Sequence, residues 1–150
     1  MFLGLFLHET PFLGGFLLYT IPMYEKDFQT KFLRWIRHNE QFKTGAYELK
    51  ITKTGSLPFN ALRDHQLLAL QQVKHRKLAY KIADDSIGFK PFDCFVLEYC
   101  PAYVVIMFYR RGTKEFFMID IDIWTKETEI SKRKSLTEDR AREIGITLSL

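Results

Sequence analysis

The sequence predicts a mixed α/β domain in which a central sheet is flanked by helices. Its periodic segments run in the order helix, strand, helix and then several strands, which is typical of a layered α/β fold. The chain has 150 residues, enough for one domain with a single large core. Hydrophobic residues make up 47% and charged residues 27%, as in ordinary folded proteins, and aromatic residues reach 15%.

Residues 1–22 are apolar, but polar residues, a proline and a glycine pair interrupt them between His8 and Gly15. A secretory signal needs a basic start and an unbroken apolar stretch, and a membrane span needs about 20 apolar residues, so neither is expected. The segment is an extension from translation starting upstream of Met23, a packing arm or a poor anchor. We favour the first, because an amphipathic helix follows Met23 directly. Residues 23–150 then form one domain without stable membrane association.

The first half of this domain is predicted to contain a helix, a strand and a second helix. Residues Tyr24 to Arg37 carry an apolar stripe at helical spacing, made of Phe28, Phe32, Trp35 and Ile36. Residues Ala46 to Lys53 read as a strand that ends before Gly55. Residues 60–77 form the second helix, whose last turn is basic and suits the negative end of the helix dipole.

The second half is predicted to contain four strands and a closing helix. The strands cover residues 78–83, 91–99, 102–110 and 115–124, and the last of them alternates between apolar and polar residues. Ser135 and Glu138 have the spacing of a capping box, and Gly145 supplies a stop, so the helix is expected between them.

Charge and cysteine content narrow the function only moderately. The net charge of +4 and the isoelectric point near 9.0 favour an anionic partner. Cys94 and Cys100 have neither C-x-x-C spacing nor a wider Cys/His set around them, so no zinc site is expected. They are interpreted as reduced core residues, which indicates a cytoplasmic setting.

Four features could carry chemistry, and each has a plainer alternative. Glu48 and Lys50 project from the same face of the predicted strand, where a carboxylate can bind Mg²⁺ and a lysine can stabilise charge on a phosphate. The plainer alternative is a solvent-exposed strand face. The other three are Asp93 at the start of an apolar strand, the His65-Gln66 pair on the second helix, and Glu25 on the first. Asp93 could instead be an exposed acid at the edge of the sheet, and His65 and Gln66 ordinary helix residues. Glu25 could be an exposed acid that the helix dipole favours in the first turn.

The stretch "YELK" followed by "LPFNALRDHQLLALQQVK" resembles the PD-(D/E)XK nuclease superfamily. It is closest to Holliday-junction resolvases of the RecU kind and to small phage resolvases. The resemblance implies a restriction-endonuclease-like fold with a mixed central sheet flanked by helices. It makes Lys50, Glu48 and Gln66 catalytic, and it makes Glu48, Asp93, Glu25 and the backbone carbonyl of Leu49 ligands of Mg²⁺, for which Mn²⁺ can substitute.

The chain departs from the family at the aspartate, which the family places on the strand before E-x-K. Only Glu40 is acidic between His38 and Tyr47, so Asp93 is the substitute, provided that its strand lies beside the Glu48 strand. A degenerate, inactive site is the alternative. Asp120 and Asp122 are weaker substitutes and are interpreted as a plain solvent-exposed face.

The expected function is hydrolysis of phosphodiester bonds in branched DNA during recombination, by a homodimer in the cytoplasm, or in the host cytoplasm if a phage encodes it. Contacts with the DNA backbone are expected from the basic run at residues 131–134 and from Lys53, Arg63, His65, Lys74, Arg76 and Lys77. The alternatives are a restriction or repair nuclease of the same fold and a non-catalytic basic module that binds nucleic acid.

Overall fold

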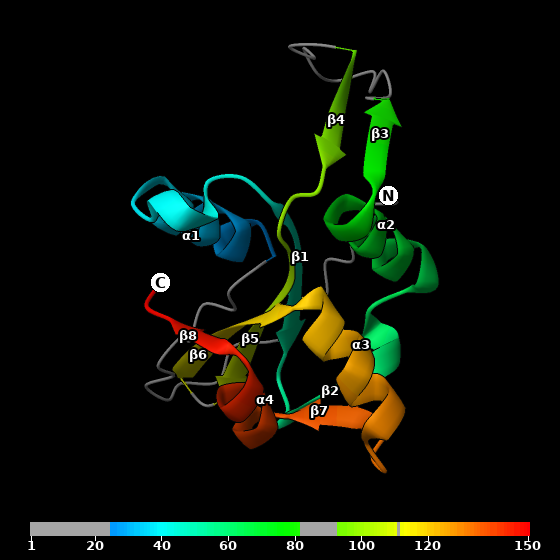
Figure 1. The fold of residues 1–150 in the computed structure, drawn as a ribbon. Helices are drawn as coiled ribbons and strands as arrows, with labels where there is room; N and C mark the ends of the chain where they lie inside the picture. The colour runs from blue at the N-terminus through cyan, green and yellow to red at the C-terminus, as the bar shows by residue number, and fades with distance from the viewer. Residues whose placement is uncertain (1–24, 82–92, 111) are drawn as a thin grey trace, which may run out of the picture.

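The computed structural model describes residues 25–81, 93–110 and 112–150, and the extension predicted at residues 1–22 lies outside them. Its centre is a four-stranded sheet with the order β1–β5–β6–β8 (Figure 1). These strands span Ala46–Thr52, Ala102–Arg110, Thr113–Asp120 and Ile146–Leu148. β1 is parallel to β5, whereas β5–β6 and β6–β8 are antiparallel. The prediction of a mixed α/β fold with a central mixed sheet is confirmed.

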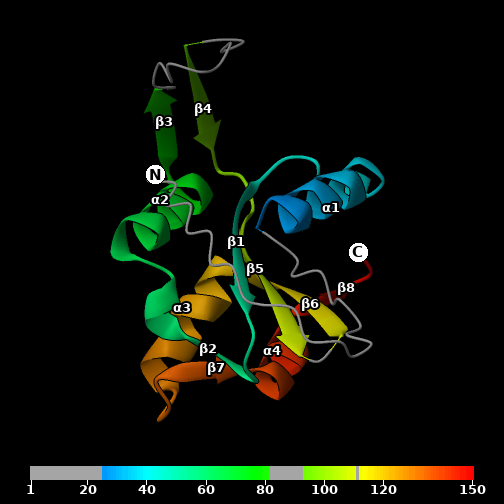
Figure 2. The ribbon, with the colours of Figure 1, turned by 180° about the vertical axis from the view of Figure 1, so that it is seen from behind.

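Helices cover both faces of this sheet. The α-helices are α1 (Glu25–Arg37), α2 (Asp64–His75), α3 (Ile121–Ile130) and α4 (Glu138–Ile144), and the 3-10 turns are η1 (Glu40–Phe42) and η2 (Phe59–Ala61). Figures 1 and 2 show α1 on one side of β1 and β5, and α2 with α3 on the other. The helix predicted at residues 24–37, the strand at 46–53 and the helix at 60–77 are therefore present, with the last trimmed at both ends.

Two hydrophobic clusters fill the space on the two faces. On the α1 face, fully buried Phe28 and Phe32 pack against alternate residues of β5, including Val105 and Met107. On the α2–α3 face, the cluster includes Leu70, Val73, Val104, Ile106, Ile119 and Trp124. Because strand side chains alternate, β1 sends Tyr47, Leu49 and Ile51 to the α1 face and Glu48 and Lys50 to the α2 face.

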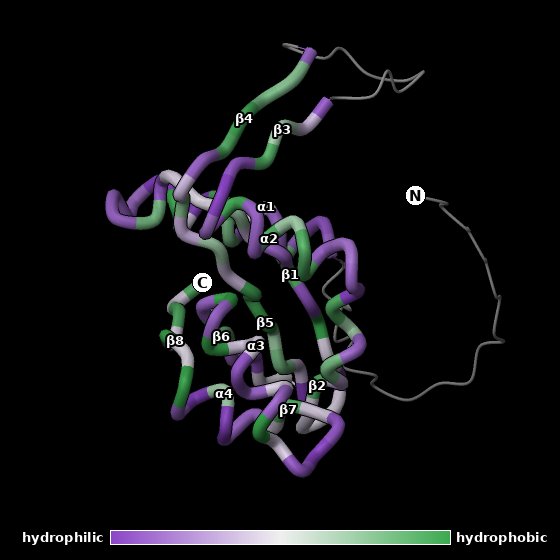
Figure 3. Tube along the Cα trace, turned by 45° about the vertical axis from the view of Figure 1, so that its right-hand side comes forward, coloured by the Kyte–Doolittle hydropathy of each residue, from purple (hydrophilic) through white to green (hydrophobic). Residues whose placement is uncertain are grey.

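Two small sheets complete the fold. β2 (Ser56–Pro58) pairs with β7 (Ser135–Thr137), and β3 (Lys77–Lys81) pairs with β4 (Cys94–Glu98), both antiparallel. The β3–β4 ribbon stands away from the body of the molecule and carries hydrophobic segments on both strands (Figure 3). The exposed rings of Tyr80 and Phe95 stack on one another there, with centroids 5.4 Å apart.

Three expectations about local structure are wrong. The strand expected over residues 115–124 ends at Asp120, whose carboxylate accepts a hydrogen bond from the Asp122 amide and begins α3. The last helix is capped by Thr137, which accepts from the Arg140 amide, because Ser135 belongs to strand β7. Finally, Cys94 is exposed rather than buried, although both cysteines are free thiols.

Candidate functional site

Glu48, Lys50 and Gln66 form a closed triangle of polar contacts between β1 and α2, called here the E-K-Q triangle. The Lys50 ammonium lies 2.9 Å from Glu48 Oε1 and donates a 3.0 Å hydrogen bond to Gln66 Oε1. The Gln66 amide nitrogen donates to the same Glu48 Oε1 at 2.7 Å. Three residues that the sequence separates by up to 18 positions thus share one site, as the resemblance implied.

The start of α2 holds Gln66 in place. Gln66 is in the first turn of the helix, and its Oε1 also accepts the Arg63 backbone N–H at 3.1 Å, which satisfies one of the free donors at a helix N-terminus. One amide side chain therefore caps the helix and connects it to the charged pair on the sheet. The orientation of Gln66 depends on both contacts, so the helix start and the triangle support one another.

The triangle is accessible from solvent at an edge of the sheet. Side-chain exposure is 28% for Glu48 and 18% for Lys50, which leaves both partly hydrated. Among the described residues, β1 pairs only with β5, so its other side is an open edge. The Ala46 N–H bonds Pro101 O on the β5 side, and backbone groups alternate along a strand. By this alternation the carbonyl of Leu49 points away from β5, to the open edge.

Glu48 and the Leu49 carbonyl supply oxygen atoms that suit Mg²⁺, which prefers hard oxygen ligands and retains several waters. Both short contacts to Glu48 use Oε1, and Oε2 has no partner within the described part of the chain. These ranges contain no group of three or more His, Cys, Asp or Glu residues that could enclose a metal ion. The residues therefore fit an open Mg²⁺ site with one carboxylate, completed by water or a phosphate oxygen.

Asp93 is not placed beside Glu48 by the strand pairing. The strand next to β1 is β5, which contributes Val104 opposite Glu48, whereas the strand after Asp93 pairs with β3 in the separate ribbon. β4 starts at the outer end of that ribbon and runs back to the body over five residues, roughly 17 Å (Figure 1). The expectation that the "PFD" strand neighbours the "ELK" strand is wrong, because its hydrogen bonds are used by β3.

Glu25 is also separated from the triangle. It is the exposed first residue of α1, and α1 packs on the face of the sheet that carries Tyr47 and Leu49. Glu48 points to the opposite face, where α2 lies. The ligand role expected for Glu25 is therefore not supported, because the sheet lies between the two carboxylates. The predicted metal set is reduced to Glu48 and the Leu49 carbonyl.

A second cluster, not anticipated from the sequence, joins the end of α2 to the start of α3. The Lys74 ammonium lies 2.5 Å from Asp120 Oδ1 and 2.6 Å from Asp122 Oδ2, and His75 Nε2 lies 2.7 Å from Asp122 Oδ1. Burial lowers the pKa of Lys74, but the hydrogen bonds that its ammonium donates to both carboxylates outweigh burial, and the pKa is raised. Burial raises the pKa of Asp122, but the bonds to Lys74 and His75 outweigh it and the pKa is lowered. Asp120 and Asp122 are thus paired groups rather than a plain solvent-exposed face.

The residues expected to contact DNA divide into two groups. Lys53, Arg63, His65 and Arg76 are exposed, and the first three flank the triangle in sequence. Lys74 is held by two carboxylates, and Lys77 lies 3.8 Å from Glu98 in the ribbon. Their charges are partly neutralised within the protein, so the exposed group is better suited to bind phosphates.

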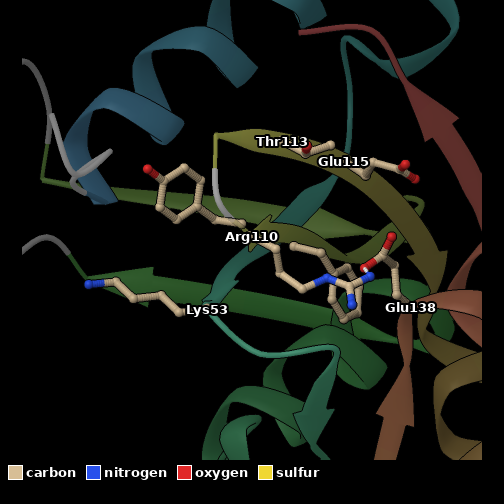
Figure 4. Close-up of a pocket in the computed structure, with 7 residues that line it drawn as sticks. Lys53, Arg110, Thr113, Glu115 and Glu138 are labelled. Carbon is tan, nitrogen blue, oxygen red and sulfur yellow. Dashed lines mark hydrogen bonds and ion pairs between the residues drawn. The ribbon is translucent and has the colours of Figure 1, made fainter. Parts of the chain in front are cut away.

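A hollow of about 630 Å³ lies at the far ends of β1 and β5 rather than at the triangle. Lys53 lies on one side of it, and Arg110 extends across it to Glu138 (Figure 4). Glu138 is almost fully buried and also pairs with Arg142, which in turn pairs with Glu115. This network has a carboxylate for each arginine, so we interpret it as a structural support for α4.

No described helix is long and apolar enough to cross a membrane. Comparisons with models of protein families, with curated proteins and with solved structures found no match.

Proposed function

We propose that this protein is a Mg²⁺-dependent endodeoxyribonuclease whose catalytic group is the E-K-Q triangle. The observation that carries the proposal is the meeting of a carboxylate, an ammonium and an amide at the open edge of a sheet. A carboxylate can hold a metal ion that assists phosphodiester hydrolysis, and a neighbouring ammonium can stabilise the charge that develops on the phosphate. The resemblance of "YELK" and "RDHQ" to the PD-(D/E)XK superfamily is independent support for the same residues.

The proposed roles follow from charge and position. Bound Mg²⁺ supplies Lewis-acid activation of the phosphate and of an attacking water, with Glu48 and the Leu49 carbonyl as its protein ligands. The Lys50 ammonium stabilises the negative charge that develops on the phosphate oxygens. Gln66 holds Glu48 and Lys50 in their mutual orientation through its two hydrogen bonds. Partial burial of Lys50 strengthens its electrostatic effect relative to a fully hydrated lysine.

Branched DNA is the proposed substrate, cut by a restriction-endonuclease-like fold. The mixed sheet with helices on both faces suits this fold. Exposed Arg63, whose backbone N–H bonds Gln66, and exposed Lys53, just past the end of β1, suit binding to the phosphate backbone without sequence preference, which weakens as salt rises. Two matched cuts in a four-way junction require a symmetric dimer, so the proposal includes a homodimer. The setting is a cytoplasm, where the two free thiols stay reduced.

The test is cleavage of labelled four-way junctions, flaps and plain duplex by the purified full chain. The proposal expects cleavage with Mg²⁺ or Mn²⁺, none with EDTA, and preference for the junction over the duplex. Glu48→Gln removes the ligand charge and should abolish cleavage, whereas Glu98→Gln in the ribbon removes an equal charge away from the triangle and should not. Absence of cleavage on every substrate with either metal contradicts the proposal.

A second candidate is a non-catalytic module that binds nucleic acid. The observation that favours it is the residue opposite Glu48 on β5, which is Val104 rather than a second carboxylate. This candidate expects junction binding without cleavage, and equal binding by the wild type and Glu48→Gln. The cleavage assay therefore separates the two candidates.

A further inference from the structure

Two cationic side chains and a histidine line a hollow between α1 and the end of the chain, on the opposite face of the sheet from the E-K-Q triangle. The hollow has a volume of about 370 Å³ and is lined by Lys31, Arg34, Trp35, His38, Ser149 and Leu150. Arg34 and Trp35 lie three and four positions after Lys31 on one face of α1, and His38 follows directly after the helix ends. The end of the chain after β8 closes the other side, and Figures 1 and 2 both show this end beside α1.

The hollow differs in charge from three others on the molecule. The others include Glu115 and Glu138, or Asp122 and Glu129, or Glu127, Asp139 and Glu143 among their lining residues. No Asp or Glu side chain lines the α1 hollow. Within the described ranges, Lys31, Arg34 and His38 have no ion-pair partner either. Among the lining residues, two cations and an imidazole thus face one anion, the terminal carboxylate of Leu150, which leaves the hollow with a net positive charge.

The wall of the hollow is packed against the core. Trp35 is half-buried, and its ring stacks on Phe42 at 5.3 Å and on Phe32 at 6.1 Å between centroids. Phe32 and Phe42 are themselves buried in the core on this face. The helix dipole favours basic residues in the last turn of α1, but it does not require Lys31 and Arg34 to converge with His38 on the chain end. A fixed aromatic floor with converging donors is suited to an anion.

We propose that the α1 hollow is a phosphate-binding site, separate from the E-K-Q triangle, for the phosphate groups of a nucleic-acid backbone or of a free phosphorylated molecule. Lys31 and Arg34 supply ammonium and guanidinium donors, and His38 supplies a ring N–H. The volume admits a phosphate group with its first waters and lies near the lower end of the range of small-ligand sites. On a nuclease, the site would bind DNA on the face opposite the cut.

The test measures binding in EDTA, so that it does not depend on whether the protein cleaves DNA. Pyrophosphate and a short DNA duplex are titrated in separate arms, followed by tryptophan emission and by anisotropy of labelled DNA. Trp35 and Trp124 are the two tryptophans of the chain, and Trp124 is only 1% exposed, so a ligand-induced change reports on Trp35. Trp35→Phe should remove the change.

The charge variants form a matched pair on one helix. Lys31→Gln with Arg34→Gln removes two charges from the hollow, and Lys26→Gln with Arg37→Gln removes the same two residue types from α1 outside it. The first pair should weaken binding about tenfold and, for DNA, reduce the slope of log affinity against log salt by about 2. The Lys26→Gln and Arg37→Gln pair should weaken pyrophosphate binding less than about twofold, because charges outside the hollow are screened by salt.

The arms also identify the source of the phosphate. Binding of pyrophosphate alone assigns the hollow to free phosphorylated molecules, and a site-specific loss in the DNA arm assigns it to the nucleic-acid backbone. The proposal is overturned if neither ligand binds, or if the two variant pairs lose affinity equally. His38→Gln, at an exposed position, is a third variant that should weaken binding even if the double variant proves unstable.

Discussion

Replacing Gln66 with leucine tests whether the E-K-Q triangle is formed in solution. The substitution keeps the side-chain volume but removes three hydrogen bonds: one to Glu48, one from Lys50 and one from the Arg63 amide. A neutral bond contributes about 1 kcal/mol and a bond to a charged group about 1.5–3 kcal/mol. Because Glu48 and Lys50 are partly hydrated and keep their own 2.9 Å contact, all three bonds are taken at or slightly below the neutral value of about 1 kcal/mol.

We therefore expect Gln66→Leu to lower the free energy of unfolding by about 2–3 kcal/mol, which lowers Tm by roughly 5–10 °C in a domain of this size. Urea unfolding and thermal melts followed by circular dichroism measure both. The matched control is Gln71→Leu on the same helix, which removes one 3.2 Å bond to Thr125 and should cost about 0.5–1 kcal/mol. Equal losses from the two variants would refute the bonding pattern of the triangle.

Two further predictions concern titrating groups. Burial and the nearby Tyr103 raise the pKa of Tyr47 to about 12 from the ordinary 10.0. Between pH 10 and 12 the Tyr47 phenol stays neutral in the folded state but ionises in the unfolded state. The stability that this group contributes below pH 10 is therefore lost across that range. Tyr47→Phe should reduce this loss when the free energy of unfolding is measured against alkaline pH. The pKa of Asp122 lies below the ordinary 3.8, because the bonds to Lys74 and His75 outweigh burial. The ionised Asp122 therefore contributes stability that is present above pH 3.8 and is lost as pH falls through its lower pKa in the folded state. Asp122→Asn should therefore reduce the loss of stability at acid pH. Since Asp122 is half-exposed, its cost at pH 7 should stay below about 1 kcal/mol, and unchanged acid unfolding would contradict the pairing.

The sequence predicted the parts of the site that depend on local pattern. Alternation placed Glu48 and Lys50 on one face of a strand, and helical spacing placed Gln66 at the start of the next helix. Their contact also needed the chain to return α2 to the β1 face, which the resemblance implied and periodicity alone could not show. The predicted flanking of a central sheet by helices followed from the order of elements.

The missed parts depend on long-range pairing or on competing local patterns. Nothing in residues 91–99 specifies which strand they pair with, so the separation of Asp93 from β1 could not be read from them. The alternation around Asp120 fits a strand up to Trp124, but Asp120 is also a good helix cap, and burial of Ile121 and Trp124 favours the helix. The α1 hollow is not predictable from local sequence patterns, because Ser149 and Leu150, which are distant from α1 in the sequence, form one of its walls.

The most direct test of the central claim is single-turnover cleavage of a four-way junction by Lys50→Met, with Lys53→Met as the control. Both variants remove one charge from a lysine in or just after β1, but only Lys50 belongs to the triangle. At saturating DNA with Mg²⁺, we expect Lys50→Met to lower the cleavage rate about 10²–10³-fold with junction affinity nearly unchanged. Lys53→Met should weaken affinity by a small factor and leave the rate unaltered. Equal cleavage rates for wild type and Lys50→Met would contradict a catalytic role for the triangle.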